Sequence, residues 1–406
     1  MNDETSRILR SLQDRRAEMV QLLQRLALIE SPSDEPGAVA PLLDVLAEEL
    51  RQSGLGVRRF RGRASAGMLY ARPRPRANGR RLQLLVGHCD TVWPLGTLNK
   101  MPVRVADDTL HGPGVLDMKG GLVQMLYAIR TVRELGLTLP ADCVVVINSD
   151  EEVGSPDSTP LIRRLARCAD RAFILEPAFG RTGKLKTSRK ASAAFLITIK
   201  GRAAHAGVNP EEGASAILEM SHQIQRLFAL NDAARGVTVN VGTIDGGIRS
   251  NVVAAEVRAE IDVRVRTLQD AAEIQTAIRA LRPVDPRTTI EIEGEFDQGP
   301  MEPLPRNQAL WRLAQELGGR LGLELEQAAV GGTSDGNTTS CYTATLDGLG
   351  SVGDGAHAPH EQVVIPQLVE RSALLALLLV APVAARPAEL KDEHAIAAAP
   401  LAEEHR

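Results

Sequence analysis

Three consecutive carboxylates follow an apolar run in the middle of the chain. Residues 144–147 are all β-branched, and Asp150, Glu151 and Glu152 come shortly after them. Such a run is typical of a buried parallel strand, and the carboxyl ends of these strands are where open α/β sheets hold ligands. Neighbouring side chains at a strand end point in different directions, so Glu151 and Glu152 can do different work in one pocket. One can bind a metal ion while the other accepts a proton from water. Taken alone, the stretch could also be a solvated acidic turn.

A histidine ends a second apolar run. Residues 82–86 read as a short buried strand, and His88 and Asp90 follow it. Asp90 lies two residues after His88 on the same side, where its carboxylate can reach the second ring nitrogen and fix the tautomer of a metal-bound imidazole. The pair by itself is more often a structural histidine and its hydrogen-bond partner than a metal site.

Two more carboxylates occupy comparable positions. Asp117 closes the glycine-rich stretch 111–121, just before an expected helix over 121–135. The stretch lacks both the P-loop lysine and serine and the GxGxxG spacing, which argues against nucleotide binding. Asp117 could bridge two metals, or it could cap the helix.

Glu176 ends a further apolar strand over 171–175. Carboxylates together with imidazole are the ligands that zinc and similar divalent ions take up.

Alternating helices and strands must position these residues, and the pattern changes near residue 188. Up to that point the spacing predicts an α/β domain that begins with one amphipathic helix over 4–30. Residues 188–298 follow the order β-α-β-β-α-β, which is typical of a ferredoxin-like unit. We therefore predict a catalytic domain formed by residues 1–187 and 299–385, an inserted domain over 188–298, and a flexible tail over 386–406.

Composition narrows the class of protein. The chain has 406 residues, of which 44% are hydrophobic and 24% charged, as in soluble globular proteins. Its net charge of -4 argues against a nucleic-acid partner. It has no apolar leader and no membrane-length apolar stretch, which predicts a cytoplasmic protein without a membrane partner. Its 4 cysteines form no CxxC pair, which argues against a disulfide framework or a cysteine zinc site.

The motifs together resemble the M20 family of metallopeptidases, and most closely its glutamate carboxypeptidase branch. The resemblance extends over residues 15–380 and rests on His88-x-Asp90, Asp117, Glu151-Glu152, Glu176-Pro177, residues 201–207 and His357. It implies a zinc-dependent exopeptidase-like α/β catalytic domain with an inserted ferredoxin-like α+β dimerisation domain.

The resemblance also implies a role for each residue of the centre. His88 and Glu176 would bind one Zn²⁺, and Glu152 and His357 would bind a second one, with His360 as the alternative to His357. Asp117 would bridge the two ions, Glu151 would be the general base, and Asp90 would orient His88. Co²⁺ or Mn²⁺ suits the same ligands.

Four further residues would contact the substrate. His205 would reach the active site of a partner subunit and stabilise the oxyanion, and Asn251 and Arg264 would hold the substrate's α-carboxylate. Lys184 would bind the γ-carboxylate of glutamate, although the basic run 181–190 could also be a solvated face. His205 and Arg264 could likewise be ordinary surface residues.

The expected activity is hydrolysis of the amide bond that joins an acyl or peptidyl group to a C-terminal amino acid, glutamate being the first candidate. The substrate would be a small molecule or short peptide with a free C-terminal carboxylate, and the enzyme a homodimer. An aminoacylase or N-acyl-amino-acid deacylase of the same family is the alternative activity. A binding protein that has lost catalysis is the alternative class.

Overall fold

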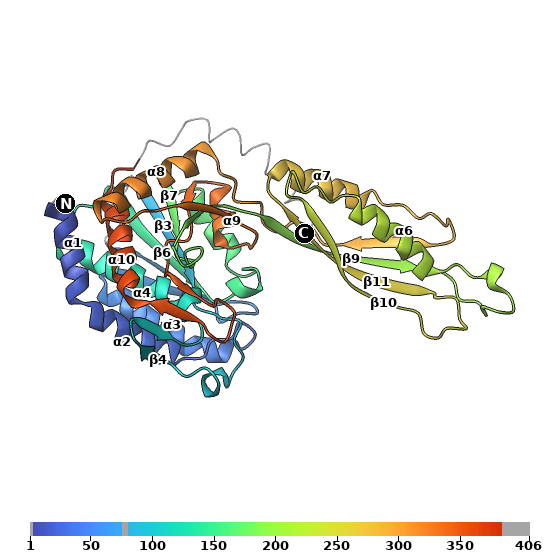
Figure 1. Ribbon diagram of the computed structural model, residues 1–406, viewed down its shortest axis with the longest axis horizontal. Helices are drawn as coiled ribbons and strands as arrows, with labels where there is room; N and C mark the ends of the chain where they lie inside the picture. Colours follow the sequence, from blue (N-terminus) through green and yellow to red (C-terminus); the bar gives the residue numbers. More distant parts are fainter. Residues whose placement is uncertain (1–2, 75–79, 384–406) are drawn as a thin grey trace. The chain divides into compact units, whose positions relative to one another are not determined.

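The computed structural model describes residues 3–74 and 80–383. Contacts divide the chain into two compact units (Figure 1). Unit 1 comprises residues 1–187, 303–329 and 334–406, and unit 2 comprises residues 188–302 and 330–333. Unit 2 begins at residue 188, as in the prediction, but its main segment ends at residue 302 rather than 298. It also includes residues 330–333, which the prediction places in the catalytic domain. The predicted tail over 386–406 lies outside the described residues.

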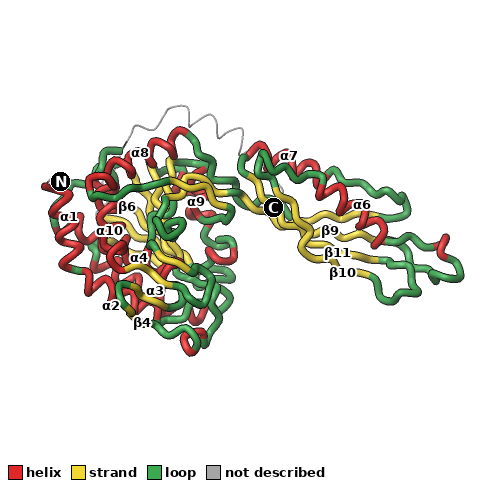
Figure 2. The backbone as a smooth tube through the Cα atoms, viewed as in Figure 1, coloured by secondary structure: helices red, strands yellow, loops and turns green. Residues whose placement is uncertain are grey.

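A six-stranded mixed sheet forms the centre of unit 1 (Figure 2). Its order is β1-β2-β6-β3-β7-β14, with the bounds β1 (Leu55–Phe60), β2 (Met68–Pro73), β3 (Leu82–His88), β6 (Asp142–Asn148), β7 (Arg171–Ile174) and β14 (Ala344–Leu346). β3 pairs in parallel with both β6 and β7. The three strands that precede the sequence-predicted acids and histidine therefore lie side by side, and their carboxyl ends share one edge.

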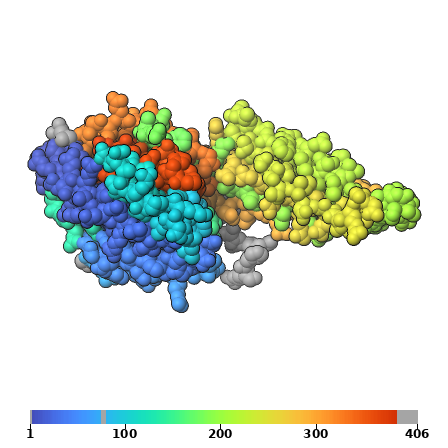
Figure 3. Space-filling view, turned by 60° about the horizontal axis from the view of Figure 1, so that its bottom comes forward, coloured from blue at the N-terminus to red at the C-terminus, as the bar shows by residue number. Residues whose placement is uncertain are grey.

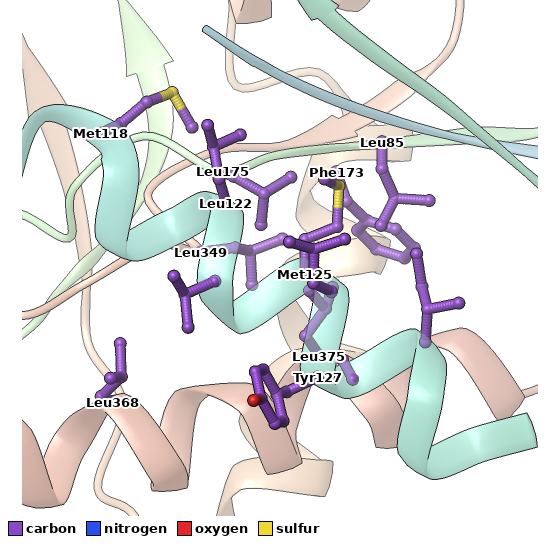
Figure 4. Packing of buried hydrophobic residues seen from close by; sticks show 14 of the residues in the cluster. Leu85, Met118, Leu122, Met125, Tyr127, Phe173, Leu175, Leu349, Leu368 and Leu375 are labelled. Atoms are coloured by element: carbon purple, nitrogen blue, oxygen red, sulfur yellow. The ribbon is translucent and has the colours of Figure 1, made fainter. Parts of the chain in front are cut away.

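Helices cover both faces of this sheet, because successive side chains of its strands point to opposite sides. Leu85 and Val145 belong to the core shared with α1 (Asp3–Asp14), α2 (Arg16–Ala27), α3 (Pro36–Gln52), α4 (Gly120–Glu134), α8 (Pro305–Arg320) and α10 (Ile365–Val380). Figure 4 shows Leu122 and Met125 of α4 packed among residues of the sheet and of α10. Val86 and Val144 instead face a second core that includes α5 (Thr159–Ala166). The short helix α9 (Asp335–Ser340) packs against α5.

The single helix predicted over residues 4–30 is wrong, because the structure has two helices that meet at Arg15. Arg15 departs from helical geometry with φ -102° and ψ 7°. Between Leu12 and Met19 the only apolar side chain is that of Ala17, so the apolar stripe that would hold a continuous helix to the core is interrupted there. α1 packs mainly on α10, whereas α2 packs on α4 and the adjoining loop.

Several short elements lie around the carboxyl edge of the main sheet. A small sheet of order β15-β16-β5-β4 consists of β4 (Arg104–Ala106), β5 (Thr109–His111), β15 (Gly353–Asp354) and β16 (Gln362–Val364). It brings the segment that contains His357 beside the segment that leads to Asp117. The remaining pieces are the pair β8 (Leu185–Arg189) and β13 (Gln327–Val330) and the helical turns η1 (Thr97–Asn99), η2 (Val115–Lys119) and η3 (Glu151–Val153).

Unit 2 is an antiparallel sheet of order β10-β11-β9-β12 with two helices on one face (Figure 1). Its elements are β9 (Ala191–Lys200), η4 (Pro210–Glu212), α6 (Ala216–Phe228), β10 (Thr238–Gly246), β11 (Glu256–Val265), α7 (Leu268–Arg279) and β12 (Thr289–Glu293). Phe195 and Ile261 of the sheet and Met220 and Ile274 of the helices share its core. In Figure 3 the surface of unit 2 is drawn mainly in the green and yellow of this stretch of chain. This order of elements is the β-α-β-β-α-β order that the sequence predicts.

Among the described residues, no helix has both the length and the apolar character needed to cross a bilayer. All four cysteines are free thiols, two of them buried.

Candidate active site

His88 lies at the centre of the carboxylate cluster. It is the last residue of β3 and only 1% exposed. Its Nε2 lies 3.3 Å from Asp117 Oδ1, 3.4 Å from Glu176 Oε1 and 3.8 Å from Glu151 Oε2. On its other side, Nδ1 lies 3.0 Å from the backbone carbonyl oxygen of Asp90 and 3.4 Å from Asp90 Oδ1. Residues from three neighbouring strand ends and from the Asp117 loop therefore meet at one imidazole.

His357 enters the same cluster from the loop between β15 and β16. Its Nε2 lies 3.2 Å from Glu152 and 3.4 Å from Asp117 Oδ2. The two carboxylate oxygens of Asp117 thus face two different histidines, His88 and His357. The alternative ligand His360 is exposed and has no contact with this cluster among those described. Asp117 therefore has the geometry of a residue shared between two sites.

The donor set fits a divalent metal ion. Ligand atoms of His88, Glu151 and Glu176 lie within 4.8 Å of one another, and so do those of His88, Asp117 and Glu152. Imidazole and carboxylate donors at this spacing suit zinc and similar ions. The first group includes Glu151, so proximity alone does not distinguish a ligand from a base at that position.

The pKa values of both histidines show how strongly the site attracts positive charge. Burial disfavours the charged form of His88, but its hydrogen bonds to Asp117 and Asp90 outweigh burial and raise the His88 pKa well above its usual value. Hydrogen bonds to Asp117 and Glu152 raise the pKa of His357 to about 10. Both imidazoles therefore hold protons that a bound metal ion would displace.

Burial and nearby charges also shift the pKa values of the two glutamates. Burial raises the pKa of Glu151 well above its usual value, and the nearby charge of Glu176 raises it further. Burial also raises the pKa of Glu152, despite its hydrogen bond with His357. A carboxyl group whose pKa is raised holds a proton more readily, and this is the property that a group which accepts a proton and later donates it requires.

Asp90 supports both His88 and the turn that carries the two glutamates. Its carboxylate accepts the backbone N–H of Glu151 at 3.3 Å and that of Glu152 at 3.2 Å. Ser33 donates its hydroxyl to the same carboxylate at 2.7 Å. Burial would raise the pKa of Asp90, but its bonds to His88 and Ser33 outweigh burial and lower it. Asp90 is thus a charged anchor for two parts of the site.

Three further residues of this region were not assigned from the sequence. Glu361 accepts the backbone N–H groups of the Asp117 loop. Lys186, 8% exposed, has its Nζ 3.9 Å from Glu176 Oε2. Asp335, 2% exposed, lies behind the glutamate turn. The one feature of the sequence that could have indicated them is that each is a charged residue in or beside an apolar or glycine-rich stretch.

The structure does not bring the four predicted substrate residues together within either unit. Lys184, in unit 1, pairs with Glu326 at 2.7 Å. In unit 2, His205 and Asn251 are exposed and lie on adjacent segments, joined by the Ala206 N–H to Asn251 carbonyl bond of 3.0 Å. Arg264 lies near the far end of β11 and pairs with Asp262 at 3.0 Å.

The chain's sequence matches a known family over most of its length. Residues 84–381 match peptidase family M20/M25/M40, a span that contains every residue of the cluster just described. The chain belongs to this family. It is therefore a metal-dependent hydrolase of the M20 type, and the two-unit α/β architecture agrees with that of the family.

Individual relatives have more than one activity. The chain is 28% identical over 377 residues to carboxypeptidase G2 of Pseudomonas sp. (strain RS-16), covering 90% of this chain and 89% of that protein. It is 25% identical over 381 residues to succinyl-diaminopimelate desuccinylase of Dechloromonas aromatica (strain RCB), covering 89% and 97%. Its fold is similar to that of aminopeptidase PepT from Bacillus cereus ATCC 10987, with a TM-score of 0.74 at 20% identity, covering 90% and 98%.

Proposed function

We propose that this M20 hydrolase is a dizinc carboxypeptidase that releases a C-terminal amino acid, glutamate first among them, from an acyl or peptidyl group. The observation that carries the proposal is the position of Asp117 between two histidines, His88 at 3.3 Å and His357 at 3.4 Å. Glu176 and Glu152 would complete the two ligand sets, and Glu151 remains for proton transfer. Likeness to carboxypeptidase G2 over most of both chains favours this activity.

Each residue of the proposed active site would have a defined task in the reaction. Two bound zinc ions would polarise the amide carbonyl and lower the pKa of the attacking water. Glu151 would accept the proton of that water at its carboxylate and later donate it to the leaving nitrogen. Asp90 would hold His88 and the Glu151 turn in place through the bonds described above. Arg264 could grip a planar carboxylate with two parallel hydrogen bonds.

The choice of glutamate is supported by resemblance rather than by a contact. Lys184, the predicted partner of the γ-carboxylate, is paired with Glu326. Likeness to a desuccinylase keeps deacylation of other N-acyl amino acids as the second candidate. A panel of N-acyl substrates that differ only in the released amino acid separates the two. Preference for glutamate that disappears in Lys184→Ala supports the first candidate, and equal rates on glutamate and neutral amino acids support the second.

We also propose that the enzyme is a homodimer in which unit 2 forms the interface. Asn251 precedes β11, and Arg264 lies eight residues beyond Glu256, the first residue of β11. Along an extended strand, the distance from Glu256 to Arg264 alone is roughly 26 Å. Asn251 and Arg264 could hold one carboxylate only if they came from different copies of the chain. The edge strand β10 supports this arrangement, since Ile244 near its end is 53% exposed and Ile248 beyond it 83% exposed.

The decisive experiment compares hydrolysis before and after metal removal. Protein treated with a chelator should lose hydrolysis of N-acyl-glutamate and regain it with zinc. Activity that is unchanged by metal removal would reject the proposal, and protein that binds less than one ion per chain would favour an inactive binding protein.

The 4 free cysteines also support the proposed cytoplasmic location.

A further inference from the structure

Asp335 is a buried carboxyl group that the proposed reaction does not use. It is the first residue of α9 and comes from a segment about 180 residues beyond the glutamate turn. Its Oδ2 accepts a hydrogen bond from Asn148 Nδ2 at 2.7 Å, and its Oδ1 accepts one from the Ser155 hydroxyl at 2.7 Å. Asn148 and Ser155 are themselves buried, at 0% and 1% exposure. One carboxyl group therefore joins two points of another part of the chain.

Those two points flank the turn that carries Glu151 and Glu152. Asn148 is the last residue of β6, and Ser155 follows the helical turn η3. Gly154 and Ser155 both have positive φ, 92° and 59°. For Ser155, which is not a glycine, this backbone conformation is unfavourable and needs contacts to hold it. The described contacts that hold it are two backbone bonds and one side-chain bond: the Ser155 N–H donates to the Asp150 carbonyl at 2.7 Å, the Ser155 carbonyl accepts the Thr159 N–H at 2.9 Å, and the Ser155 hydroxyl donates to Asp335 at 2.7 Å.

Asp335 is itself fixed by its surroundings. Ser334 caps α9 by accepting the Gly336 N–H at 3.0 Å, and its own N–H donates to Asn337 at 3.0 Å. The Ser334 hydroxyl also donates to Asp347 at 2.7 Å. The carboxyl group of Asp335 is thus presented from a rigid helix start that is anchored next to β14.

We infer that Asp335 is a positioning residue that closes the glutamate turn at both ends and so sets where Glu151 and Glu152 stand relative to each other. The inference rests on the proposed function, in which Glu152 is a metal ligand and Glu151 the base. If Asp335 is removed, the turn loses a bond at each end, and both glutamates move relative to Asp117 and His88. Chemistry is affected more than substrate binding, because the side-chain bonds of Asp335 go to Asn148 and Ser155, which belong neither to the proposed ligand sets nor to the proposed substrate-binding residues.

Hydrogen bonding and charge can be separated by one conservative change. Burial raises the pKa of Asp335 to about 7, even though its bond with Ser155 acts against that rise. In Asp335→Asn the new amide can accept from Asn148 through its oxygen and donate to the Ser155 hydroxyl through its nitrogen, because a hydroxyl both donates and accepts. Both bonds survive while the charge is lost. In Asp335→Ala neither bond survives.

The test uses full-length protein with cobalt in place of zinc. Asp335→Ala should lower kcat about tenfold or more with little change in KM, and should change the visible spectrum of the bound Co²⁺. Asp335→Asn should restore most of kcat and the parental spectrum. Asp157→Asn, a change at a nearby carboxylate that binds backbone N–H groups of residues 63–65, is the matched control and should leave both readouts unchanged. Equal kcat and spectrum in Asp335→Ala and the parent would overturn the inference, and so would equal damage in Asp335→Ala and Asp335→Asn.

Two further readouts keep the result unambiguous. If Asp335→Ala does not fold, Ser155→Ala removes one of the two bonds and should give an intermediate loss of kcat and an intermediate spectral change. An unchanged kcat and spectrum in a folded Ser155→Ala protein would then count against the inference. Failure of the proposed function looks different, because the parent protein itself would bind no Co²⁺ or hydrolyse no N-acyl amino acid.

Discussion

Glu361 accepts the backbone N–H of Asp117 at 3.0 Å. The same carboxylate accepts the N–H groups of Gly114 and Leu116 at 2.9 Å each and the indole N–H of Trp93 at 2.9 Å. Glu361 follows His357 by four residues. One short segment therefore supplies the candidate ligand His357 and also holds the loop that carries Asp117. The position of Asp117 between His88 and His357 therefore depends on a residue outside the proposed ligand sets.

Glu361→Gln should weaken metal binding by roughly 10–100-fold, the usual cost of removing a residue that orients a ligand. Glutamine can still accept some of the N–H groups, but its NH₂ group would face a backbone donor. Zinc affinity measured by competition with a chromophoric chelator checks this expectation. His360→Ala, a change at the neighbouring exposed histidine, is the control. An affinity in Glu361→Gln equal to that of the control would show that the loop does not need Glu361.

Glu151→Gln and Glu152→Gln should separate catalysis from metal binding. Glu151→Gln keeps the proposed ligand sets and loses proton transfer, so kcat should fall about 10²–10⁴-fold with the metal content retained. Glu152→Gln removes a ligand, so metal content should fall together with activity. Elemental analysis of the two proteins beside steady-state kinetics decides the matter. Loss of metal in Glu151→Gln would make that residue a ligand and require another base.

The stability of the metal-free protein should fall as the pH rises. The folded-state pKa of His357, about 10, lies above its ordinary value of 6.5, so its stabilising contribution is full below 6.5 and is lost as the pH rises toward 10. Asp335 acts in the same direction, because burial raises its pKa from 3.8 to about 7. The lowered pKa of Asp90 affects stability only in more acidic solution.

Melting temperatures of chelator-treated protein should therefore decrease between about pH 6 and pH 9.5, and added zinc should reduce the decrease by replacing the protons. Differential scanning fluorimetry across this range, with and without zinc, measures both effects. A metal-free protein that becomes more stable with rising pH would contradict the assignment of these groups.

Mixing two inactive variants should restore activity if His205 acts in the partner's site. In an equimolar, exchanged mixture of Glu151→Gln and His205→Ala, half of the dimers contain one chain of each kind, and one of their two sites has both residues. About a quarter of the parental activity per chain is expected. A mixture as inactive as its components would place His205 in its own chain's site or outside any site. Each variant mixed with the parent protein gives the reference.

The centre of the site could be predicted from the sequence because strand ends are legible. His88, Glu151 and Glu176 each follow an apolar run, and parallel neighbours place their ends together. His357 follows no such strand and was found only by family resemblance. Its position depends on the small sheet that joins β16 to β5, whose strands are too short to give a clear pattern.

The supporting residues were beyond sequence reasoning for a physical reason. Glu361 and Asp335 act through hydrogen bonds to segments roughly 245 and 180 residues away, and no local periodicity reports such contacts.

The orientation of the lysines near residue 184 was also not predictable from the sequence. Lys184, just before β8, is paired with Glu326, whereas Lys186, within β8, has its Nζ 3.9 Å from Glu176. Two residues that are two apart in one strand would point to the same side, so the difference arises because β8 begins after Lys184. Element boundaries of this kind are the least predictable feature of a sequence.

Anomalous X-ray scattering at the zinc edge, from crystals of the zinc-loaded enzyme, tests the central claim most directly. Two peaks are predicted, roughly 3.5–4 Å apart, one between His88 and Glu176 and the other between Glu152 and His357, with Asp117 touching both and Glu151 coordinating neither. A single peak, or a peak whose ligands include Glu151 in place of Glu152, would contradict the dizinc assignment.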